Sequence, residues 1–262
     1  MQKRPARRCV VVVWATRDGM PMTEQLFQLD AAVREFDAVV EGVDAKRRTV
    51  VLNRTAFYPG GGGQPCDHGL LGLGDHEVEV VKVFRAGAEI VHTLDGPVPP
   101  VRATVHGALD WSRRHALMRT HTALHILCGV VWRDYGAQVT GGSVRPLTGR
   151  LDFELEALSA ELACEIEEKL NVEVDAARQV RVALLPRAEA LRIPDLIRTK
   201  VNLLPEGITQ IRTVEIVGLD LQADGGTHVA NTREVGRIRI AGHKNKGRIN
   251  KRIEIELASP TT

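Results

Sequence analysis

Four side chains that can bind a metal ion occur in this sequence as two pairs. His121 and His125 are four residues apart in a segment with helical periodicity, so both imidazoles lie on one face, one turn apart. Asp224 and His228 lie on either side of a Gly-Gly turn, which lets a carboxylate and an imidazole point toward one cation. One histidine pair is weak evidence, but the second pair favours one bound divalent metal, Zn²⁺.

The histidine spacing also occurs in zinc proteases, in which the residue after the first histidine is a general-base glutamate. In this sequence that residue is Thr122, which argues against peptide hydrolysis.

A glycine-rich segment covers residues 55–65, and its four consecutive glycines allow positive φ and the close approach of a backbone or a ligand. It lacks the Gly-Lys-Ser/Thr sequence of a phosphate-binding loop. Two interpretations stay open from the residues alone: a plain turn, or a loop that delivers Gln64 to a site.

The elements that must position these residues follow from hydrophobic periodicity. Short alternating runs between glycine-rich turns predict a small β domain from about residue 35 to 108. A helix that carries both histidines is expected from a Ser112 cap to about Trp132. Further predicted elements are an amphipathic helix over 156–174, a short helix between Pro186 and Pro194, and strands over 211–216 and 236–240.

These motifs resemble those of alanyl-tRNA synthetase editing domains, in which a His-x-x-x-His helix is followed by Cys-Gly-Gly-Thr-His-Val. Residues 227–229 match that pattern, but Asp224 stands where the family usually has cysteine. The sequence is also similar to free-standing AlaX editing proteins over residues 57–65, 110–114 and 244–248. The similarity spans about residues 22 to 257, and the order of the motifs is more specific than any single motif.

The resemblance implies an α+β fold. A glycine-rich β-barrel-like domain is expected over residues 22–108, followed over 109–262 by a zinc-binding α+β editing domain of the threonyl/alanyl-tRNA synthetase type. Residues 1–21 are expected to be an extension or a misassigned start, because the patterned sequence begins at Met22 and no signal-peptide cleavage pattern precedes it.

The resemblance also implies the substrate, an aminoacyl ester on the terminal adenosine of mischarged tRNA for alanine. Ester hydrolysis needs an activated water and stabilisation of the oxyanion, both of which zinc can supply. Gln64 is then expected near the ester as an orienting hydrogen-bond partner. Asp224 is expected to be a working metal ligand, and a general base toward the attacking water is its competing role.

Selectivity for serine has a physical reason, because a pocket for alanine rejects such a near-isostere only by about a hundredfold. Thr140 aligns with the family threonine that reads the serine hydroxyl, although a turn role is the local alternative. We therefore expect deacylation of Ser-tRNA in trans, with Gly-tRNA left open. The alternative is a zinc-containing tRNA-binding module without catalysis; a full synthetase is disfavoured, since the chain has no room for an activation domain.

Local basic patches are expected to contact the tRNA backbone, because the net charge of +2 produces no strong overall field. The candidates are Arg113, Arg114 and Arg119 near the histidine helix, and Lys244, Lys246, Arg248, Lys251 and Arg252 in a segment without acidic residues.

The location of the protein is expected to be cytoplasmic. The four cysteines have neither the spacing of a zinc ribbon nor the density of a disulfide scaffold, which predicts reduced thiols. No segment has the length and apolarity of a membrane span, and no obligate protein partner is evident.

Overall fold

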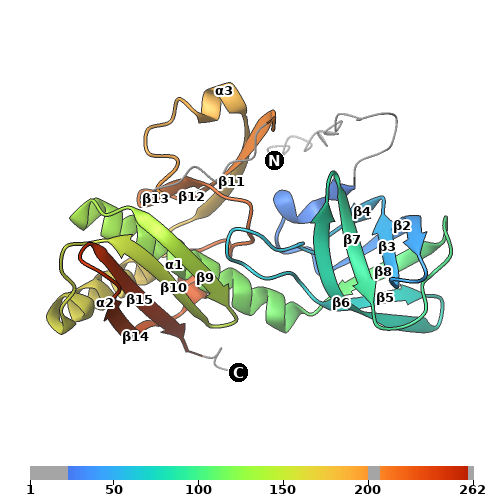
Figure 1. The fold of residues 1–262 in the computed structure, drawn as a ribbon, viewed down its shortest axis with the longest axis horizontal. Coiled ribbons are helices and arrows are strands. Elements are labelled where there is room, and N and C mark those ends of the chain that lie inside the picture. The colour runs from blue at the N-terminus through green and yellow to red at the C-terminus, as the bar shows by residue number, and fades with distance from the viewer. Residues whose placement is uncertain (1–22, 200–206, 259–262) are drawn as a thin grey trace, which may run out of the picture.

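The computed structural model describes residues 23–199 and 207–258, so the expectation for residues 1–21 lies outside the described residues. Figure 1 shows a β-barrel and an α+β body, with the long helix α1 running from one toward the other. This arrangement confirms the α+β fold with an N-terminal barrel.

The barrel is closed by six antiparallel strands in the order β2-β3-β7-β6-β5-β8. Their bounds are β2 Glu35–Asp44, β3 Thr49–Leu52, β5 Gly69–Leu73, β6 His76–Ala86, β7 Glu89–Leu94 and β8 Thr104–Leu109. Alternate apolar residues of each strand point inward, as Phe36, Ala38 and Val40 do in β2, and are buried together. The predicted β domain is therefore confirmed.

The glycine-rich loop leaves this barrel between β4 (Arg54–Thr55), which pairs with β1 (Glu24–Gln25), and β5. Gly60 to Gly63 all have positive φ, which only glycine adopts without strain. The loop then meets the α+β body, where the carbonyl of Gly63 accepts from Val144 N at 2.9 Å.

Helix α1 (Trp111–Tyr135) carries the histidine pair through the centre of the molecule. The expected Ser112 cap is wrong by two residues, because the Asp110 side chain accepts from Arg113 N at 3.0 Å and the helix begins at Trp111. Gly136 ends the helix at a φ of 62°, in the left-handed conformation of a helix C-cap.

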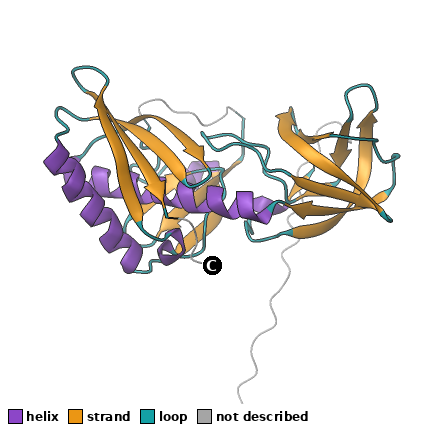
Figure 2. Cartoon of the chain, turned by 90° about the horizontal axis from the view of Figure 1, so that it is seen from below, coloured by secondary structure: helices purple, strands orange, loops and turns teal. Residues whose placement is uncertain are grey.

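A four-stranded antiparallel sheet, in the order β14-β15-β10-β9, supports α1. Its strands are β9 Val139–Arg145, β10 Thr148–Glu154, β14 Ile238–Asn245 and β15 Asn250–Leu257. In Figure 2 the helices lie along one face of this sheet. The predicted amphipathic helix is α2 (Ala160–Asp175), capped by Ser159, and it buries Ile166 and Leu170 in the core of this body.

A smaller sheet of β11 (Val180–Pro186), β12 (Gln210–Ile216) and β13 (Asp220–Ala223) brings the second ligand pair toward α1. Two short helices complete the body, α3 (Arg187–Ala190) between the two prolines and η2 (Thr232–Val235) before β14. The expected strand over 236–240 begins instead at Ile238, because Gly236 has a φ of 70°. Among the described residues, no helix is long and apolar enough to cross a membrane.

Candidate metal centre

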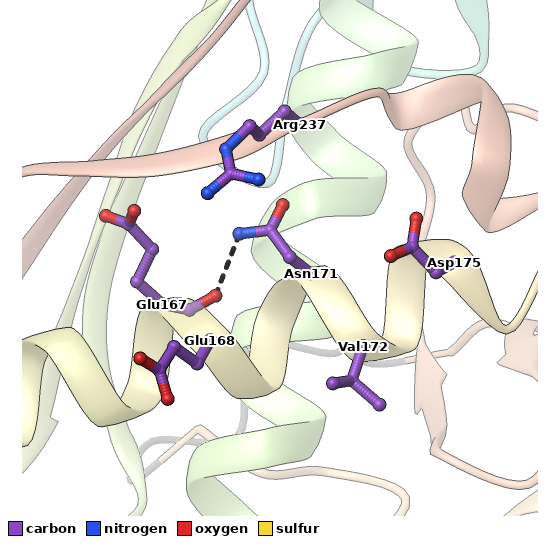
Figure 3. Close-up of a pocket in the computed structure, with 6 residues that line it drawn as sticks. All are labelled: Glu167, Glu168, Asn171, Val172, Asp175 and Arg237. Carbon is purple, nitrogen blue, oxygen red and sulfur yellow. Dashed lines mark hydrogen bonds between the residues drawn. The ribbon is translucent and has the colours of Figure 1, made fainter.

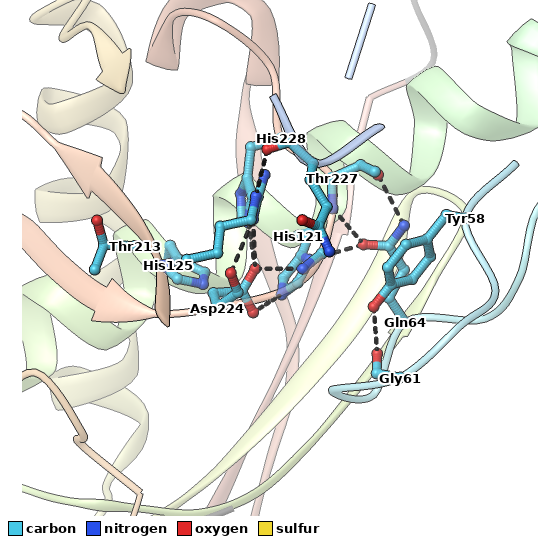
Figure 4. A network of polar contacts seen from close by, with 12 residues as sticks. Tyr58, Gly61, Gln64, His121, His125, Thr213, Asp224, Thr227 and His228 are labelled. Atoms are coloured by element: carbon cyan, nitrogen blue, oxygen red, sulfur yellow. Dashed lines mark hydrogen bonds and ion pairs between the residues drawn. The ribbon is translucent and has the colours of Figure 1, made fainter. Parts of the chain in front are cut away.

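The two ligand pairs predicted from the sequence meet in one buried cluster (Figure 4). His121 and His125 project from α1, and Asp224 and His228 from the turn that follows β13. One potential donor atom from each of the four lies within 4.8 Å of all the others. Tetrahedral zinc with bonds of about 2.0 to 2.2 Å holds its ligand atoms roughly 3.4 Å apart, so the cluster needs only small side-chain rotations to surround such an ion.

Each imidazole of the cluster is held at Nδ1 by a partner outside it. The three contacts are His121 with Gln64 Oε1 at 2.8 Å, His125 with Asp220 Oδ2 at 3.0 Å, and His228 with Thr122 Oγ1 at 3.2 Å. An Nδ1–H that donates outward leaves the Nε2 lone pair directed at the centre. This outward hydrogen bond is typical of histidines that bind metals.

The Nε2 atoms of two of the imidazoles lie beside the carboxylate of Asp224. His228 Nε2 lies 3.0 Å from Asp224 Oδ2, and His121 Nε2 lies 3.6 Å from Oδ1. Oδ2 also accepts from Gly226 N at 2.7 Å, which fixes the carboxylate within its own turn. Arg212 Nη1 donates to the Asp224 carbonyl at 2.9 Å and so holds the backbone of the same residue.

The electrostatics of the cluster favour neutral imidazoles at His121 and His228 beside a charged carboxylate. Burial lowers the pKa of His121 to about 4, and burial together with the neighbouring His121 lowers that of His228 well below its usual value. Burial would also lower the pKa of His125, but the hydrogen bond and charge of Asp220 raise it overall. Burial would raise the pKa of Asp224, yet His121 and His228 lower it well below its usual range. Imidazole nitrogen and carboxylate oxygen are both zinc donors.

The glycine-rich loop does deliver Gln64 to the cluster, so the interpretation of this segment as a plain turn is wrong. Gln64 is buried, and its Oε1 accepts from both His121 Nδ1 and Thr227 N, the latter at 3.1 Å. Its Nε2 donates to Thr227 Oγ1 at 2.8 Å. Protein groups thus contact both ends of this amide, and one of them is His121; the expected role of Gln64 as an orienting partner of the ester stays a prediction.

Thr140 lies on β9, outside the hydrogen bonds of the cluster. The neighbouring Val139 donates from its N–H to Arg198 O at 3.0 Å, and Arg198 forms an ion pair with Asp220. The exposed Thr140 side chain itself donates to Asn250 Oδ1 at 3.1 Å. Its expected role toward serine stays a prediction.

Three of the cations expected to contact tRNA are buried, so that expectation is wrong for them. Arg114 is fully buried and forms an ion pair with Asp67. Arg119 donates to two carbonyls, of Val235 and Ala258, which ties α1 to the end of the described chain. Lys251 Nζ donates to the carbonyls of Gly247 and Arg248. The sequence could not separate Arg114 and Arg119 from exposed cations, because their partners are an acid and carbonyls of other segments; the partners of Lys251 are carbonyls of its own turn.

The other five expected cations remain at least partly accessible. Arg113 is half-buried and donates to Cys66 O, and Arg248 is exposed. Lys244 pairs with Glu254 at 3.4 Å. Lys246 and Arg252 both lie beside Asp152. Residues 244–252 include no acidic residue, but the fold places Glu254 and Asp152 beside these cations.

Sequence reasoning missed the outer partners Asp220 and Thr122. Asp220 is buried at the start of β13 and holds His125, and its position four residues before Asp224 was the only signal in the sequence. In the sequence Thr122 only argues against a protease, whereas in the structure its hydroxyl contacts His228 and also accepts from Val229 N at 3.3 Å.

A separate pocket of about 250 Å³ lies on α2 and is not part of this centre (Figure 3). It is lined by Glu167, Glu168, Asn171, Val172, Asp175 and Arg237. Asn171 contacts both the N–H and the carbonyl of Ile238, so its amide anchors β14 to the helix. The three carboxylates give this hollow a charge unsuited to a polyanionic substrate.

Comparison with known proteins agrees with this geometry. Residues 19–113 match the model for tRNA synthetases class II (A), and residues 211–254 match the threonyl and alanyl tRNA synthetase second additional domain. An alanyl-tRNA editing protein AlaX-M of Saccharolobus solfataricus is 38% identical over 88% of this chain and 98% of its own length. The AlaX-M of Methanosarcina acetivorans is 39% identical over 90% of this chain and 99% of its own. The chain belongs to the AlaX family of alanyl-tRNA editing proteins.

AlaX proteins are hydrolases of aminoacyl-tRNA, so the fold and the buried cluster are those of an aminoacyl-tRNA hydrolase. The alanine–tRNA ligase of Ignicoccus hospitalis is also similar, at 39% identity over 88% of this chain but only 25% of the ligase. This AlaX chain therefore matches one region of that much longer protein.

Proposed function

We propose that this protein removes serine from mischarged tRNA for alanine, in trans, by zinc-dependent hydrolysis of the aminoacyl ester. The observation that carries the proposal is the set of three imidazoles, each contacted at Nδ1 from outside, that cluster with the Asp224 carboxylate so that one donor atom of each of the four lies within 4.8 Å of the others. An editing role in trans agrees with the AlaX relatives, which match this chain over nearly their whole length.

The residues that would hold the zinc are His121, His125, Asp224 and His228. Bound zinc would polarise the ester carbonyl and lower the pKa of water, the two requirements of ester hydrolysis. Asp224 is a sound replacement for the family's cysteine, because a carboxylate carries the same charge as a thiolate and has a similar bond length, about 2.0 to 2.2 Å against about 2.3 Å.

The chain around the cluster fixes the geometry before substrate binds. Gln64 and Asp220 hold two of the imidazoles, and a Cβ placed on Gly62 would lie only 3.9 Å from Asp224 Oδ1. The glycine-rich loop thus passes directly beside the cluster. Tyr58 donates to Gly61 O at 3.1 Å and steadies the loop, and burial raises the pKa of its phenol, which therefore stays protonated.

Thr140 is our candidate for the group that reads the serine hydroxyl. A site that requires a hydroxyl spares correctly charged alanine, because the polar partner would otherwise be left unpaired. Gly-tRNA offers no hydroxyl, so removal of glycine would not depend on Thr140.

The test is deacylation of tRNA for alanine charged with serine or with alanine, by the wild-type protein and by Thr140→Val. The wild type should release serine much faster than alanine, and the variant should lose most of the activity on Ser-tRNA while it keeps the fold, because the swap removes only the hydroxyl. Thr148→Val, on the neighbouring strand β10, is the matched control. Unchanged serine release by Thr140→Val would refute the role of Thr140, and equal rates on serine and alanine would refute the proposed selectivity.

A further inference from the structure

A group of three cations surrounds a single carboxylate on the face of the four-stranded sheet opposite α1 and α2. Asp152 Oδ1 accepts from Arg252 Nε at 2.7 Å, and its Oδ2 accepts from Arg252 Nη2 at 2.9 Å and Arg150 Nη1 at 3.1 Å. Lys246 Nζ lies 3.7 Å from the same Oδ2. We name Arg150, Asp152, Lys246 and Arg252 the Asp152 cluster. Three positive charges around one negative charge leave it with a surplus of two.

Two other cations on the same face are each paired with one acid. Arg239 on β14 forms an ion pair with Glu256 on β15, and Lys244 pairs with Glu254 at 3.4 Å. In the register of the sheet, Arg239 is opposite Glu256, and Asp152 is opposite Arg252. The register also places Glu254 opposite Arg150 and Lys244 opposite Arg252, and with this ion pair included the four cations and two acids still leave a surplus of two positive charges.

The cluster is also pre-organised. The Asp152 side chain is only 10% exposed, whereas those of Arg150 and Lys246 are 35% and 42% exposed. A buried carboxylate thus orients the cations, and their remaining N–H groups can donate to an anion from solvent. Guanidinium groups held in this way suit phosphate oxygens.

Two short backbone segments connect the Asp152 cluster with the metal centre. A Cβ placed on Gly141 of β9 would lie 3.7 Å from Asp152 Oδ2. The next residue, Gly142, has its carbonyl oxygen 3.4 Å from a Cβ placed on Gly63 of the glycine-rich loop. Gly62, one residue earlier, is the residue beside Asp224. The glycine-rich loop and β9 thus pack closely against each other between the Asp152 cluster and the metal centre, which places the two sites near each other on the molecule.

We propose that the Asp152 cluster is an anion site that binds backbone phosphates of the unpaired 3′ end of the tRNA while the terminal ester lies at the metal centre. The inference rests on the proposed function, because it uses the substrate assigned there. The site would contribute to affinity and position, since phosphate contacts fix the register of a nucleic acid and carry no base specificity.

The experiment compares Arg150→Gln and Lys246→Gln with the control Arg239→Gln, which removes a cation from the same face at a one-to-one ion pair. Each protein is assayed on Ser-tRNA and on the seryl ester of adenosine, which contains no phosphate. Binding of uncharged tRNA for alanine is measured over a range of salt concentrations.

Arg150→Gln and Lys246→Gln should each raise KM for Ser-tRNA by about threefold to tenfold with kcat within twofold, and leave hydrolysis of seryl-adenosine unchanged. The slope of log binding constant against log salt should become shallower by about 0.7 for each phosphate that the variant no longer neutralises. Arg239→Gln should match the wild type in every assay.

The inference is overturned if the salt slope of Arg150→Gln and Lys246→Gln equals that of Arg239→Gln, or if both substrates are affected equally. Failure of the proposed function has a different signature: the wild type would hydrolyse neither ester. In that case the salt slopes with uncharged tRNA still decide whether the anion site exists.

Discussion

Among the individual residues of the centre, the outer partners hold the imidazoles of the ligands in place. Gln64, Asp220 and Thr122 each contact one imidazole at Nδ1. Removal of such a partner typically weakens metal affinity by about 10-fold to 100-fold. A ligand should therefore be distinguishable from a positioning residue by the size of the decrease in affinity.

Asp224 provides that comparison. Asp224→Ala should lose zinc affinity by more than the roughly 100-fold expected for an outer partner, and lose Ser-tRNA hydrolysis with it. Asp224→Cys should keep activity and hold zinc more tightly, because a thiolate is the softer donor. Competition with a chromogenic chelator measures both affinities. An Asp224→Ala protein with full zinc affinity and no activity would instead identify Asp224 as a general base.

At the scale of elements, the turn between Asp224 and His228 has to pass closely behind α1. A Cβ on Gly226 would lie 2.3 Å from His121 Cε1 and 2.8 Å from Gln64 Oε1, whereas a Cβ on Gly225 would meet nothing within 4 Å. The contact with His121 and Gln64 thus requires glycine at position 226, whereas no neighbouring atom requires it at position 225.

Gly226→Ala should displace His121 and Gln64 and lower zinc affinity at least tenfold, while Gly225→Ala should bind zinc almost as the wild type does. Both variants add one methyl group to the same turn, so the difference isolates the contact with His121. Metal titration together with circular dichroism makes the comparison. Equal affinities for the two variants would show that the turn does not pack on α1 as described.

The sequence predicts these elements better than it predicts their contacts. The barrel strands, α1, α2 and β12 follow from periodicity, which is a local property. The pairing of His121 and His125 with residues 224–228 was expected, because both motifs contain ligand types at suitable spacing. The contact of Asp220 with His125 and the burial of Arg114 against Asp67 were not expected, because the paired residues lie 95 and 47 residues apart along the chain.

At the scale of the whole molecule, the centre depends on contacts between the barrel loop and the α+β body. Gln64 and Thr227, which hydrogen-bond to each other, are 163 residues apart. The barrel has its own buried histidine, His92, whose Nε2 lies 2.9 Å from Thr55 Oγ1. Burial lowers the pKa of His92 to about 4.

This shift predicts how stability depends on pH. The unfolded chain binds a proton at His92 below about pH 6.5, but the folded protein does so only near pH 4, so the free energy of unfolding falls as the pH drops between these values. The effect of this one group is at most about 3 kcal/mol. His92→Asn should show a shallower decrease in urea unfolding of the metal-free protein between pH 6.5 and 4. An identical slope in the two proteins would contradict a neutral, buried His92.

The central claim is that one zinc ion, held by the buried cluster, is required for hydrolysis of Ser-tRNA. The most direct test titrates metal-free protein with zinc and measures bound metal and the rate of serine release in the same samples. We predict that activity rises in proportion to bound zinc and reaches its maximum at one ion per chain. Full activity in protein shown to contain no metal would contradict the account.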